Sequence, residues 1–391
     1  MAKLLEITGK AISGEWGQDD DTGTGIPVLR TTNFTNEGFV NYKNVVTRSI
    51  SKKNIAEKYL RHGDVIIEKS GGSDKQPVGR VIFFEGEENK YLFNNFTGLL
   101  RVQNPEEWLP KYVFYALYAY YRNGGTRAFE NRTTGLHNLQ VDNYVKSVDI
   151  PKLSYRKQQH ICETLDHVRD AVAYRERQLT KLDELIKARF VEMFGDCRLN
   201  PKGWVTKNLD QVADVGSSKR VFVEELQSEG IPFYRGTEVG ALAEGKSIRP
   251  ELFITEGHYK QLCEATGKPQ KGDLLMPSIC PDGRIWVVDT DAPFYFKDGR
   301  VLWVHLTSQN YNPVFLLYTL KDRIMTDYES IASGTTFAEL KIFALKKCRI
   351  FDVPLSLQNQ FADFVAEVDK SKLLAEVFAQ STCILAENRS K

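Results

Sequence analysis

The sequence lacks the marks of a secreted, membrane-spanning or zinc-stabilised protein. Its six cysteines are widely scattered and include no Cys-x-x-Cys pair, which argues against a structural zinc site and favours a reducing compartment. The longest apolar run, Val113 to Tyr121, has nine residues, whereas about 20 are needed to cross a bilayer. No apolar core followed by a cleavage site opens the chain. These absences predict a soluble cytoplasmic protein without a metal site.

An excess of charge of one sign is also missing. Lys and Arg together number 52 against 51 Asp and Glu, which gives a formal net charge of +1. Any contact with nucleic acid must therefore come from a local basic patch. Apolar residues make up 42% and aromatic residues 11% of the chain, so it has enough material to fold. A length of 391 residues predicts two to three domains.

The chain contains a direct repeat. The phrase "IPVLRTTNF" at 26–34 is answered by "IPFYRGTEV" at 231–239, and each places Arg two residues before Thr. Further features recur in the same order, roughly two hundred residues apart. They are Gly-Asp before an apolar strand (63–67 and 272–276), Gly-Arg before an apolar residue (79–81 and 283–285), an aromatic stretch after Pro (110–121 and 313–324) and an apolar-Pro pair before a long helix (150–151 and 353–354). This order predicts two similar mixed α/β domains, each followed by one long helix.

Both predicted long helices carry an apolar stripe. The residues of the first stripe are Ile161, Leu165, Val168, Val172, Leu179, Leu182 and Ile186, and those of the second, less regular stripe are Phe361, Phe364, Val368 and Phe378. Spacings of three, four and seven are typical of helix pairing, so we expect an antiparallel coiled coil. The alternative, in which each helix packs on its own domain, stays open. Antiparallel pairing would relate the repeats by an approximate two-fold axis and hold two similar domains at a fixed separation, an arrangement suited to duplex DNA.

These features resemble the specificity subunit of a type I restriction–modification system. The resemblance rests on the Ile-Pro-x-x-Arg-x-Thr phrases, the Gly-Asp segments and the junction "MFGDCRLNPKGW" at 193–204, and it covers essentially the whole chain. It implies an α+β chain with target recognition domains at 1–150 and 196–352, and spacer helices at 151–195 and 353–391. The first half lacks a counterpart of "NPKGW", so we expect its N-terminus to be shorter than in typical members.

The resemblance also implies a function and partners. Each recognition domain would read one half of a bipartite DNA site, while the helices set the spacing and dock two copies of the methyltransferase subunit. Double-stranded DNA and that subunit are thus the expected partners, and participation of restriction subunits stays open. S-adenosylmethionine is expected on the methyltransferase partner, with no cofactor on this chain. Adenine methylation and DNA cleavage would reside on the partner subunits.

In the first half, the candidate DNA-binding residues come from the Ile-Pro phrase, a polar segment at 68–80 and a basic segment at 122–139. They are Arg30, Thr32, Asn33, Lys69, Ser70, Ser73, Lys75, Gln76, Arg80, Arg122, Arg127, Arg132, Thr133 and His137. Arg suits the task because its planar fork binds guanine or phosphate through two hydrogen bonds. We interpret 68–80 as a loop between strands, whose glycines let backbone N–H groups approach a phosphate. An internal ion pair for Arg30 and its counterpart Arg235, and a merely solvated loop at 68–80, remain alternatives.

In the second half, the candidates are Lys219, Arg220, Arg235, Thr237, Glu238, Arg284, Thr335 and Thr336. Asn33 suits adenine, whereas its counterpart Glu238 would accept from cytosine N4, so the halves are expected to read different bases. We expect Arg132→Ala to weaken binding of every site similarly. We expect Arg30→Ala to relax the choice at one base pair by about 1–3 kcal/mol, as measured by competition with single-base variants.

Two rival classes are a DNA-modifying enzyme and a coiled-coil scaffold with two protein-binding heads. An adenine methyltransferase needs Asn/Asp-Pro-Pro-Phe/Tyr, but the nearest text, at 312–315, has Val in the third position. The glycines of "SGGSD" at 70–74 are followed by Lys-Gln-Pro, which would spoil the helix of a cofactor-binding turn. The carboxylates around Asp64 and Asp282 do not complete a nuclease set. We therefore expect a non-catalytic chain, and a steep salt dependence of DNA binding would distinguish it from a scaffold.

Overall fold

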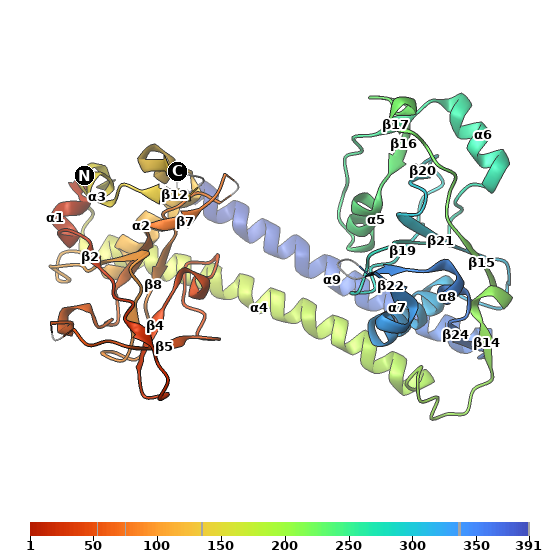
Figure 1. Ribbon diagram of the computed structural model, residues 1–391, viewed down its shortest axis with the longest axis horizontal. Helices are drawn as coiled ribbons and strands as arrows, with labels where there is room; N and C mark the ends of the chain where they lie inside the picture. Colours follow the sequence, from red (N-terminus) through yellow and green to blue (C-terminus); the bar gives the residue numbers. More distant parts are fainter. Residues whose placement is uncertain (53, 75, 134–135, 335–337, 390–391) are drawn as a thin grey trace. The chain divides into compact units, whose positions relative to one another are not determined.

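The computed structural model describes residues 1–52, 54–74, 76–133, 136–334 and 338–389, without the side chains of 132, 133, 136 and 375–389. These residues form two compact units (Figure 1). Unit 1 comprises Met1–Val172 and the segment from Cys383 onward, and unit 2 comprises Ala173–Thr382. Helix α4 (Tyr155–Phe194) contributes its first part to unit 1 and the remainder to unit 2.

The elements of unit 1 that precede α4 follow one another in short segments. They are β1 (Ala2–Lys3), α1 (Leu4–Thr8), β2 (Ile12–Ser13), β3 (Gln18–Asp19), β4 (Ile26–Leu29), η1 (Thr31–Asn33), β5 (Val46–Ser49), η2 (Ala56–Lys58), β6 (Val65–Glu68), β7 (Ser70–Gly72), β8 (Val81–Phe83), β9 (Leu92–Phe93), β10 (Thr97–Leu100), α2 (Pro110–Arg122), η3 (Gly125–Phe129), β11 (Glu130–Thr133), β12 (Leu136–Leu139), α3 (Val141–Ser147) and β13 (Asp149–Ile150).

The elements after α4 repeat much of this order. They are β14 (Thr206–Asn208), η4 (Leu209–Gln211), β15 (Ala213–Gly216), η5 (Val223–Glu225), β16 (Ile231–Tyr234), α5 (Gly236–Ala243), β17 (Phe253–Ile254), α6 (Glu256–Thr266), β18 (Leu274–Pro277), β19 (Trp286–Val287), β20 (Tyr295–Phe296), β21 (Val301–Leu306), α7 (Pro313–Ile331), β22 (Ala332–Ser333), β23 (Glu339–Leu340), α8 (Ile342–Lys346), β24 (Arg349–Phe351) and α9 (Leu355–Arg389).

The two units share one sheet topology. The central sheet has the order β2-β10-β6-β8 in unit 1 and β15-β21-β18-β19 in unit 2, antiparallel in both. A parallel pair accompanies each sheet, β4 with β9 and β16 with β20. A short antiparallel pair, β1 with β13 and β14 with β24, joins the ends of each domain. The predicted α+β fold with two similar domains in tandem is confirmed.

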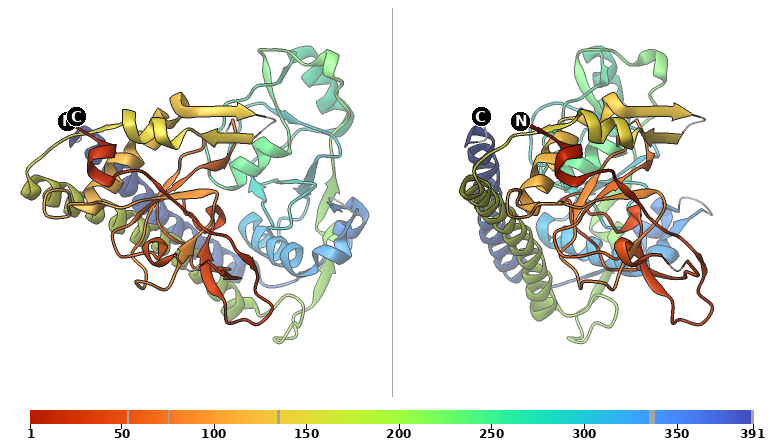
Figure 2. Two further views of the ribbon diagram at one scale, coloured as in Figure 1. Left: turned by 60° about the vertical axis from the view of Figure 1, so that its left-hand side comes forward. Right: turned by 90° about the vertical axis from the view of Figure 1, so that its left-hand side faces the viewer.

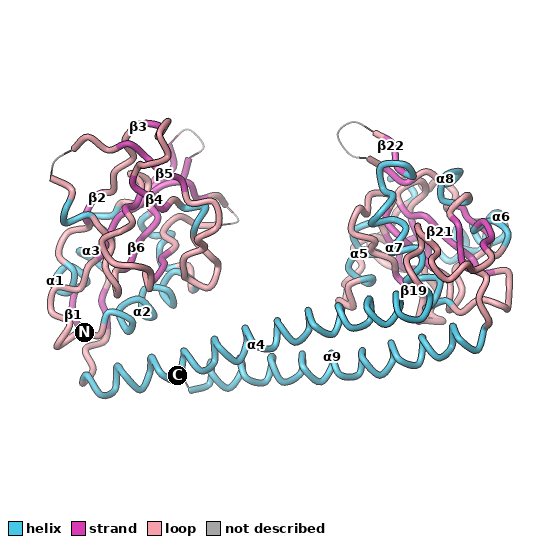
Figure 3. The backbone as a smooth tube through the Cα atoms, turned by 90° about the horizontal axis from the view of Figure 1, so that it is seen from below, coloured by secondary structure: helices cyan, strands magenta, loops and turns pink. Residues whose placement is uncertain are grey.

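The central strands β6 and β18 each open with three apolar residues, and both faces of their sheets are covered. In β6, Val65 and Ile67 pack toward α2, and Ile66 belongs to a separate cluster on the other face. In β18, Leu274 and Met276 likewise belong to one cluster and Leu275 to another. Such two-sided burial is typical of continuous apolar runs. In unit 1, α2 lies between the sheet and the first part of α4 (Figure 3).

The repeated Gly-Asp pair builds the same turn before each central strand. Gly63 and Gly272 have φ of 92° and 94°, a region in which a side chain is strained. The carboxylates of Asp64 and Asp273 each accept the backbone N–H three residues earlier, at 2.8 Å. The repeat predicted from sequence therefore reflects a repeated turn at the start of the core strand.

Within unit 2, the later part of α4 lies alongside α9 (Figures 2 and 3). The rings of Phe190 and Phe194 lie 5.4 and 5.6 Å from that of Phe361. Further along, Asp183 binds Lys372 at 2.7 Å. The contact at Phe361, near the start of α9, is with the end of α4, whereas the contact at Lys372, later on α9, is with the earlier residue Asp183 of α4. The two helices are therefore antiparallel in this region.

The apolar stripes do not form a seam between two helices alone. Ile186, Phe361 and Val368 share one buried cluster with residues of α7, and Leu182 and Phe364 pack against this cluster. Leu165, Val168, Val172 and Leu179 are half-buried, and the side chain of Phe378 lies outside the described ones. Ile161 packs against the core of unit 1, which corrects its assignment as a helix-pairing residue. Each stripe thus also serves the globular domain beside it, because the domains supply α2 and α7 as further apolar surfaces.

Candidate nucleic-acid interface

The Arg of each Ile-Pro phrase begins a short helical turn. Strand β4 ends at Leu29, and the backbone N–H of Arg30 donates to the side chain of Asn33 at 3.0 Å. In unit 2 the backbone N–H of Arg235 donates to Glu238 in the same way, at 2.8 Å. The third residue after each Arg is therefore a capping residue of the turn.

This capping role corrects the expectation that Asn33 and Glu238 are free to read bases. Asn33 is 1% exposed, and its amide donates to the backbone carbonyls of Asn41 and Lys43. Burial by itself raises the pKa of Glu238, but hydrogen bonds from Arg235 outweigh it and lower that pKa to about 2. Both side chains are occupied inside the domain.

The two arginines differ in their surroundings. Arg235 is held by two carboxylates, with its Nε 3.1 Å from Glu238 and its Nη2 3.0 Å from Glu251. The guanidinium of Arg30 instead donates a 3.2 Å hydrogen bond to the backbone carbonyl of Asn44. The internal ion pair considered for both arginines thus occurs at Arg235, whereas Arg30 bonds to a backbone carbonyl. Thr32 and Thr237 are exposed.

Part of the segment 68–80 is a strand and not a loop. Ser70–Gly72 form β7, which pairs with β12. The Gly-Ser composition concealed this strand, because such residues are depleted in sheets and common in turns. Lys69 donates to Ser13 at 2.9 Å, and burial, assisted by Lys58, lowers its pKa. Ser70 is half-buried, Ser73 is exposed, and Lys75 lies outside the described residues.

The basic segment 122–139 runs from the end of α2 through η3 into a β-hairpin, β11 with β12. His137 is 7% exposed and lies 3.3 Å from Glu130, so its ring is turned into the domain, contrary to expectation. Arg132 and Thr133 belong to β11 by their backbone, and their side chains are outside the described part. In unit 2 the equivalent hairpin is β22 with β23, and Thr335 and Thr336 lie outside the described residues.

A polar groove of about 730 Å³ in unit 1 gathers several predicted residues; we call it groove 1. Its lining residues include Gln76, Arg80, Arg122 and Arg127 together with the unpredicted Tyr118 and Tyr121. The groove lies where β8 and α2 meet the segment after β7. Arg30, Lys69 and His137 are not among its lining residues.

Unit 2 has a groove of about 390 Å³, which we call groove 2; it shares with groove 1 the position of Arg284, the repeat counterpart of Arg80. Predicted residues Arg235, Thr237 and Arg284 line it, together with Lys297 and Arg300, which were not predicted. The sequence did hold a signal for them, because the two basic residues flank an Asp-Gly pair, which is typical of tight turns. Of the remaining candidates, Lys219 is exposed and Arg220 lies 3.2 Å from Asp298 of this turn.

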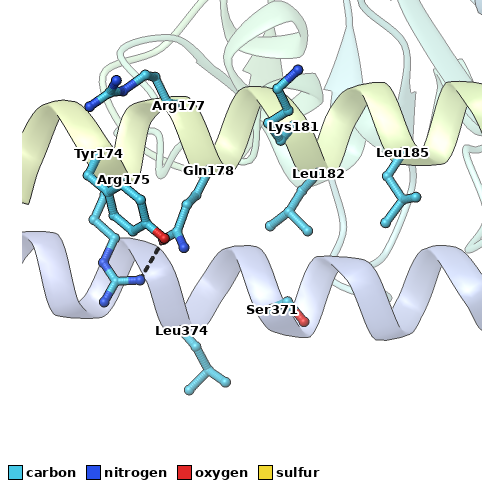
Figure 4. Close-up of a pocket in the computed structure, with 9 residues that line it drawn as sticks. All are labelled: Tyr174, Arg175, Arg177, Gln178, Lys181, Leu182, Leu185, Ser371 and Leu374. Carbon is cyan, nitrogen blue, oxygen red and sulfur yellow. Dashed lines mark hydrogen bonds between the residues drawn. The ribbon is translucent and has the colours of Figure 1, made fainter.

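A second kind of surface lies between the paired helices of unit 2 (Figure 4). The hollow has a volume of about 720 Å³, and α4 lines it with Tyr174, Leu182 and Leu185 while α9 contributes Ser371 and Leu374. Exposed fractions of 47% for Leu185 and 62% for Leu374 leave apolar area uncovered. We call it the helix groove.

The described residues contain no group of three or more His, Cys, Asp or Glu side chains placed to hold a metal ion. None of the helices in this part of the chain combines the length and the apolar character needed to cross a membrane.

Comparison with known proteins identifies one matching family model and a curated relative of similar sequence. Residues 201–377 match the family model described as the type I restriction modification DNA specificity domain. The chain is 27% identical over 184 residues to the putative type I restriction enzyme specificity subunit S.HindORF215P of Haemophilus influenzae. This match covers 47% of the chain and 44% of the relative, so the chain spans about half the length of the curated relative that it matches.

Two solved structures share the fold. One is the S subunit of a type I restriction-modification system from M. genitalium, at 15% identity and a TM-score of 0.53. The other comes from work on the complex assembly and conformational transition of the type I R-M system, at 16% identity and a TM-score of 0.55. Each comparison covers 99% of this chain and 93% of the other.

Proposed function

We infer that the chain is the DNA specificity subunit of a type I restriction–modification system, in which each globular domain reads one half of a bipartite DNA site. The match to the specificity domain lies wholly in unit 2. Unit 1 repeats the sheet order of unit 2, its parallel strand pair and its capped Arg turn. The observation that carries the proposal is this equivalence, which extends the DNA-reading role of the matched domain to the first half.

The chemistry of the two grooves supports binding of DNA. Each brings together at least three cationic side chains, although the net charge of the whole chain is only +1. Local clustering of Arg and Lys is what contact with a polyanion requires. The residues of the two grooves differ, which suits two half-sites of different sequence.

Catalysis is assigned to partner subunits. Adenine methylation would take place on two methyltransferase subunits, which carry S-adenosylmethionine and dock on the long helices. Restriction subunits, where present, would join through the same complex, and the assembly would act on DNA in the cytoplasm. The helix groove suits docking because Tyr174, Leu185 and Leu374 leave apolar surface exposed on paired helices.

The function is tested by sequencing the methylated DNA of a host that expresses this chain with its cognate methyltransferase. We expect methylated adenines in a split, non-palindromic motif that disappears when the chain is omitted. Methylation that persists without the chain, or a motif without two separate halves, would contradict the proposal.

Docking is tested by Leu374→Asp, which places a charge on the helix groove. We expect fewer methyltransferase subunits per complex in native mass spectrometry, because burying an unpaired carboxylate opposes association. Leu199→Asp is the matched control, since Leu199 is 77% exposed and does not line the helix groove. Equal stoichiometry for the two variants would place the docking surface elsewhere.

A further inference from the structure

Arg80 in groove 1 is fixed by a buried carboxylate. Its Nε and Nη2 lie 3.0 and 2.9 Å from the two oxygens of Glu68, which is 2% exposed. This bidentate pair occupies one edge of the guanidinium and holds its plane. With its amide oxygen facing Arg80, Gln76 lies 3.2 Å from Nη1. The remaining donor edge is therefore directed toward a residue that lines the groove.

Arg284 is its counterpart in groove 2. Both arginines follow a glycine of positive φ in the repeated Gly-Arg phrase, Gly79 and Gly283. The Nε of Arg284 lies 2.8 Å from a carboxylate oxygen of Asp282. An Arg held by a carboxylate thus lines a groove at the same place in each unit.

The lining of the two grooves has one sign of charge. Among their described lining residues, groove 1 has Arg80, Arg122 and Arg127, groove 2 has Arg235, Arg284, Lys297 and Arg300, and no Asp or Glu lines either. Glu68, which holds Arg80, is buried, whereas Asp282, which holds Arg284, is 54% exposed but does not line groove 2. An anion entering either groove would meet cations and neutral polar groups.

The recessed position of Arg80 discriminates between two kinds of DNA contact, and the side chain of Arg284 is more exposed, at 37%. Base edges lie at the floor of a major groove about 8.5 Å deep, so a protein reads them with protruding side chains. Phosphates form the outer ridges of the duplex and can enter a concave surface. The Arg80 side chain is 17% exposed, which favours contact with a phosphate ridge over contact with a base edge.

We propose that grooves 1 and 2 each hold a phosphodiester segment of DNA, with Arg80 and Arg284 as phosphate-binding residues positioned by Glu68 and Asp282. This inference rests on the proposed function and adds to it by separating backbone contacts from base contacts. Arg80 and Arg284 then set affinity and register, while sequence is read by side chains that protrude.

The test uses the full chain in complex with its cognate methyltransferase subunits. Fluorescence anisotropy follows binding to a duplex carrying the motif found by methylation sequencing and to a duplex of equal length without it, at several salt concentrations. The variant of groove 1 is the double change Glu68→Gln with Arg80→Gln, so that no unpaired carboxylate is left in the core. The variant of groove 2 is Arg284→Gln alone, because its partner Asp282 is 54% exposed and can stay solvated. Arg61→Gln is the control for removal of one charge, since Arg61 is exposed and does not line groove 1.

In each groove variant we expect the affinity for both duplexes to fall by the same factor and the methylated motif to stay unchanged. The plot of log K against log salt should become less steep, by about 0.9 in slope for each phosphate that the variant no longer binds. Arg61→Gln should leave the slope as it is, and thermal unfolding of each complex establishes that the variants are folded.

Two outcomes would overturn the inference. A relaxed base choice at one position with an unchanged salt slope would make Arg80 or Arg284 a base-reading residue. Unchanged affinity, slope and motif would remove the grooves from the DNA interface. A wild-type complex that binds both duplexes equally and methylates no split motif would instead reject the proposed function itself.

Discussion

Two buried glutamines join the long helices to the globular domains by the same set of hydrogen bonds. The side-chain oxygen of Gln158 accepts from the backbone N–H of Leu109, and that of Gln358 accepts from Asn312. Each amide nitrogen donates to two backbone carbonyls, one of them just before its own helix. Both side chains are 0% exposed. They fix the start of each long helix against the first turn of α2 or α7.

Gln358→Ala tests this junction in unit 2. The substitution leaves three backbone groups without their partner, of which the carbonyl of Val353 is buried and the groups of Asn310 and Asn312 are partly buried. An unpaired buried group costs about 1–3 kcal/mol, so the free energy of unfolding should fall by about that amount. Urea denaturation measures the change. Gln360→Ala is the matched control, since Gln360 is exposed on the same helix and its substitution should change stability by no more than about 0.5 kcal/mol. Equal effects of the two changes would contradict the role of Gln358.

The Arg235–Glu238 pair predicts a dependence of stability on pH. The folded-state pKa of Glu238 is lowered from 4.5 to about 2 against the raising effect of burial, chiefly by hydrogen bonds from Arg235. A lowered pKa stabilises the fold above the unfolded-state value and loses that contribution as pH falls from about 4.5 toward 2. Glu238→Gln should therefore flatten the decline of stability between about pH 5 and pH 2 in denaturation experiments. A decline of equal steepness in Glu238→Gln and in the parent chain would contradict this role of the pair.

At the scale of secondary-structure elements, the long helices serve both each other and the domains. In unit 1, α4 binds α2 through Asp166, which accepts from Tyr115 at 2.6 Å and pairs with Lys111 at 3.0 Å. In unit 2, α4 and α9 share one apolar cluster with α7. Packing in unit 2 is therefore three-sided, with α4, α7 and α9 in contact with one another. This packing anchors the two long helices to the domain beside them.

Phe361→Ala tests this three-sided packing. Its ring is 0% exposed and lies 5.4 Å from Phe190 of α4 and 5.3 Å from Tyr318 of α7. The cavity left by the change should lower the free energy of unfolding by about 3–5 kcal/mol. Leu373→Ala, at a position that is 61% exposed on the same helix, should change it by less than about 0.5 kcal/mol. A small effect of Phe361→Ala would mean that α9 is not anchored there.

At the scale of the whole molecule, a nearly neutral chain carries two basic grooves. The 52 Lys and Arg residues are balanced by 51 Asp and Glu, and many arginines are paired internally, as Arg101 is with Asp64 at 2.6 Å. A net charge near zero gives the chain little overall positive field to attract DNA from a distance. Under the proposed function, tight binding by the assembly would then need phosphate contacts from the methyltransferase subunits.

We therefore expect the isolated chain to bind random duplex weakly, and the complex to bind it more tightly and with a steeper salt dependence than the chain alone. Each further phosphate that is bound steepens the slope of log K against log salt by about 0.9. Anisotropy titrations of the chain and of the complex, at matched salt concentrations, measure the difference. Equal affinities and slopes would show that the chain itself supplies the backbone contacts.

The sequence by itself determined the tandem repeat, the α+β class and the two long helices. These follow from local patterns. Apolar runs such as 65–67 and 274–276 mark core strands, and helix periodicity places α4 at Tyr155–Phe194 within the expected 151–195. The same pattern occurs in both halves, so each half supports the assignment of elements made in the other.

The tertiary structure alone decided which polar side chains are available to DNA. Arg30 and Arg235 look equivalent in sequence, yet Arg235 is held by Glu251, 16 residues away. Arg80 and Arg122 come together in one groove from separate elements, and Asn33 is buried as a cap. The physical reason is that charge pairing and burial depend on neighbours in space, which periodicity along the chain does not specify.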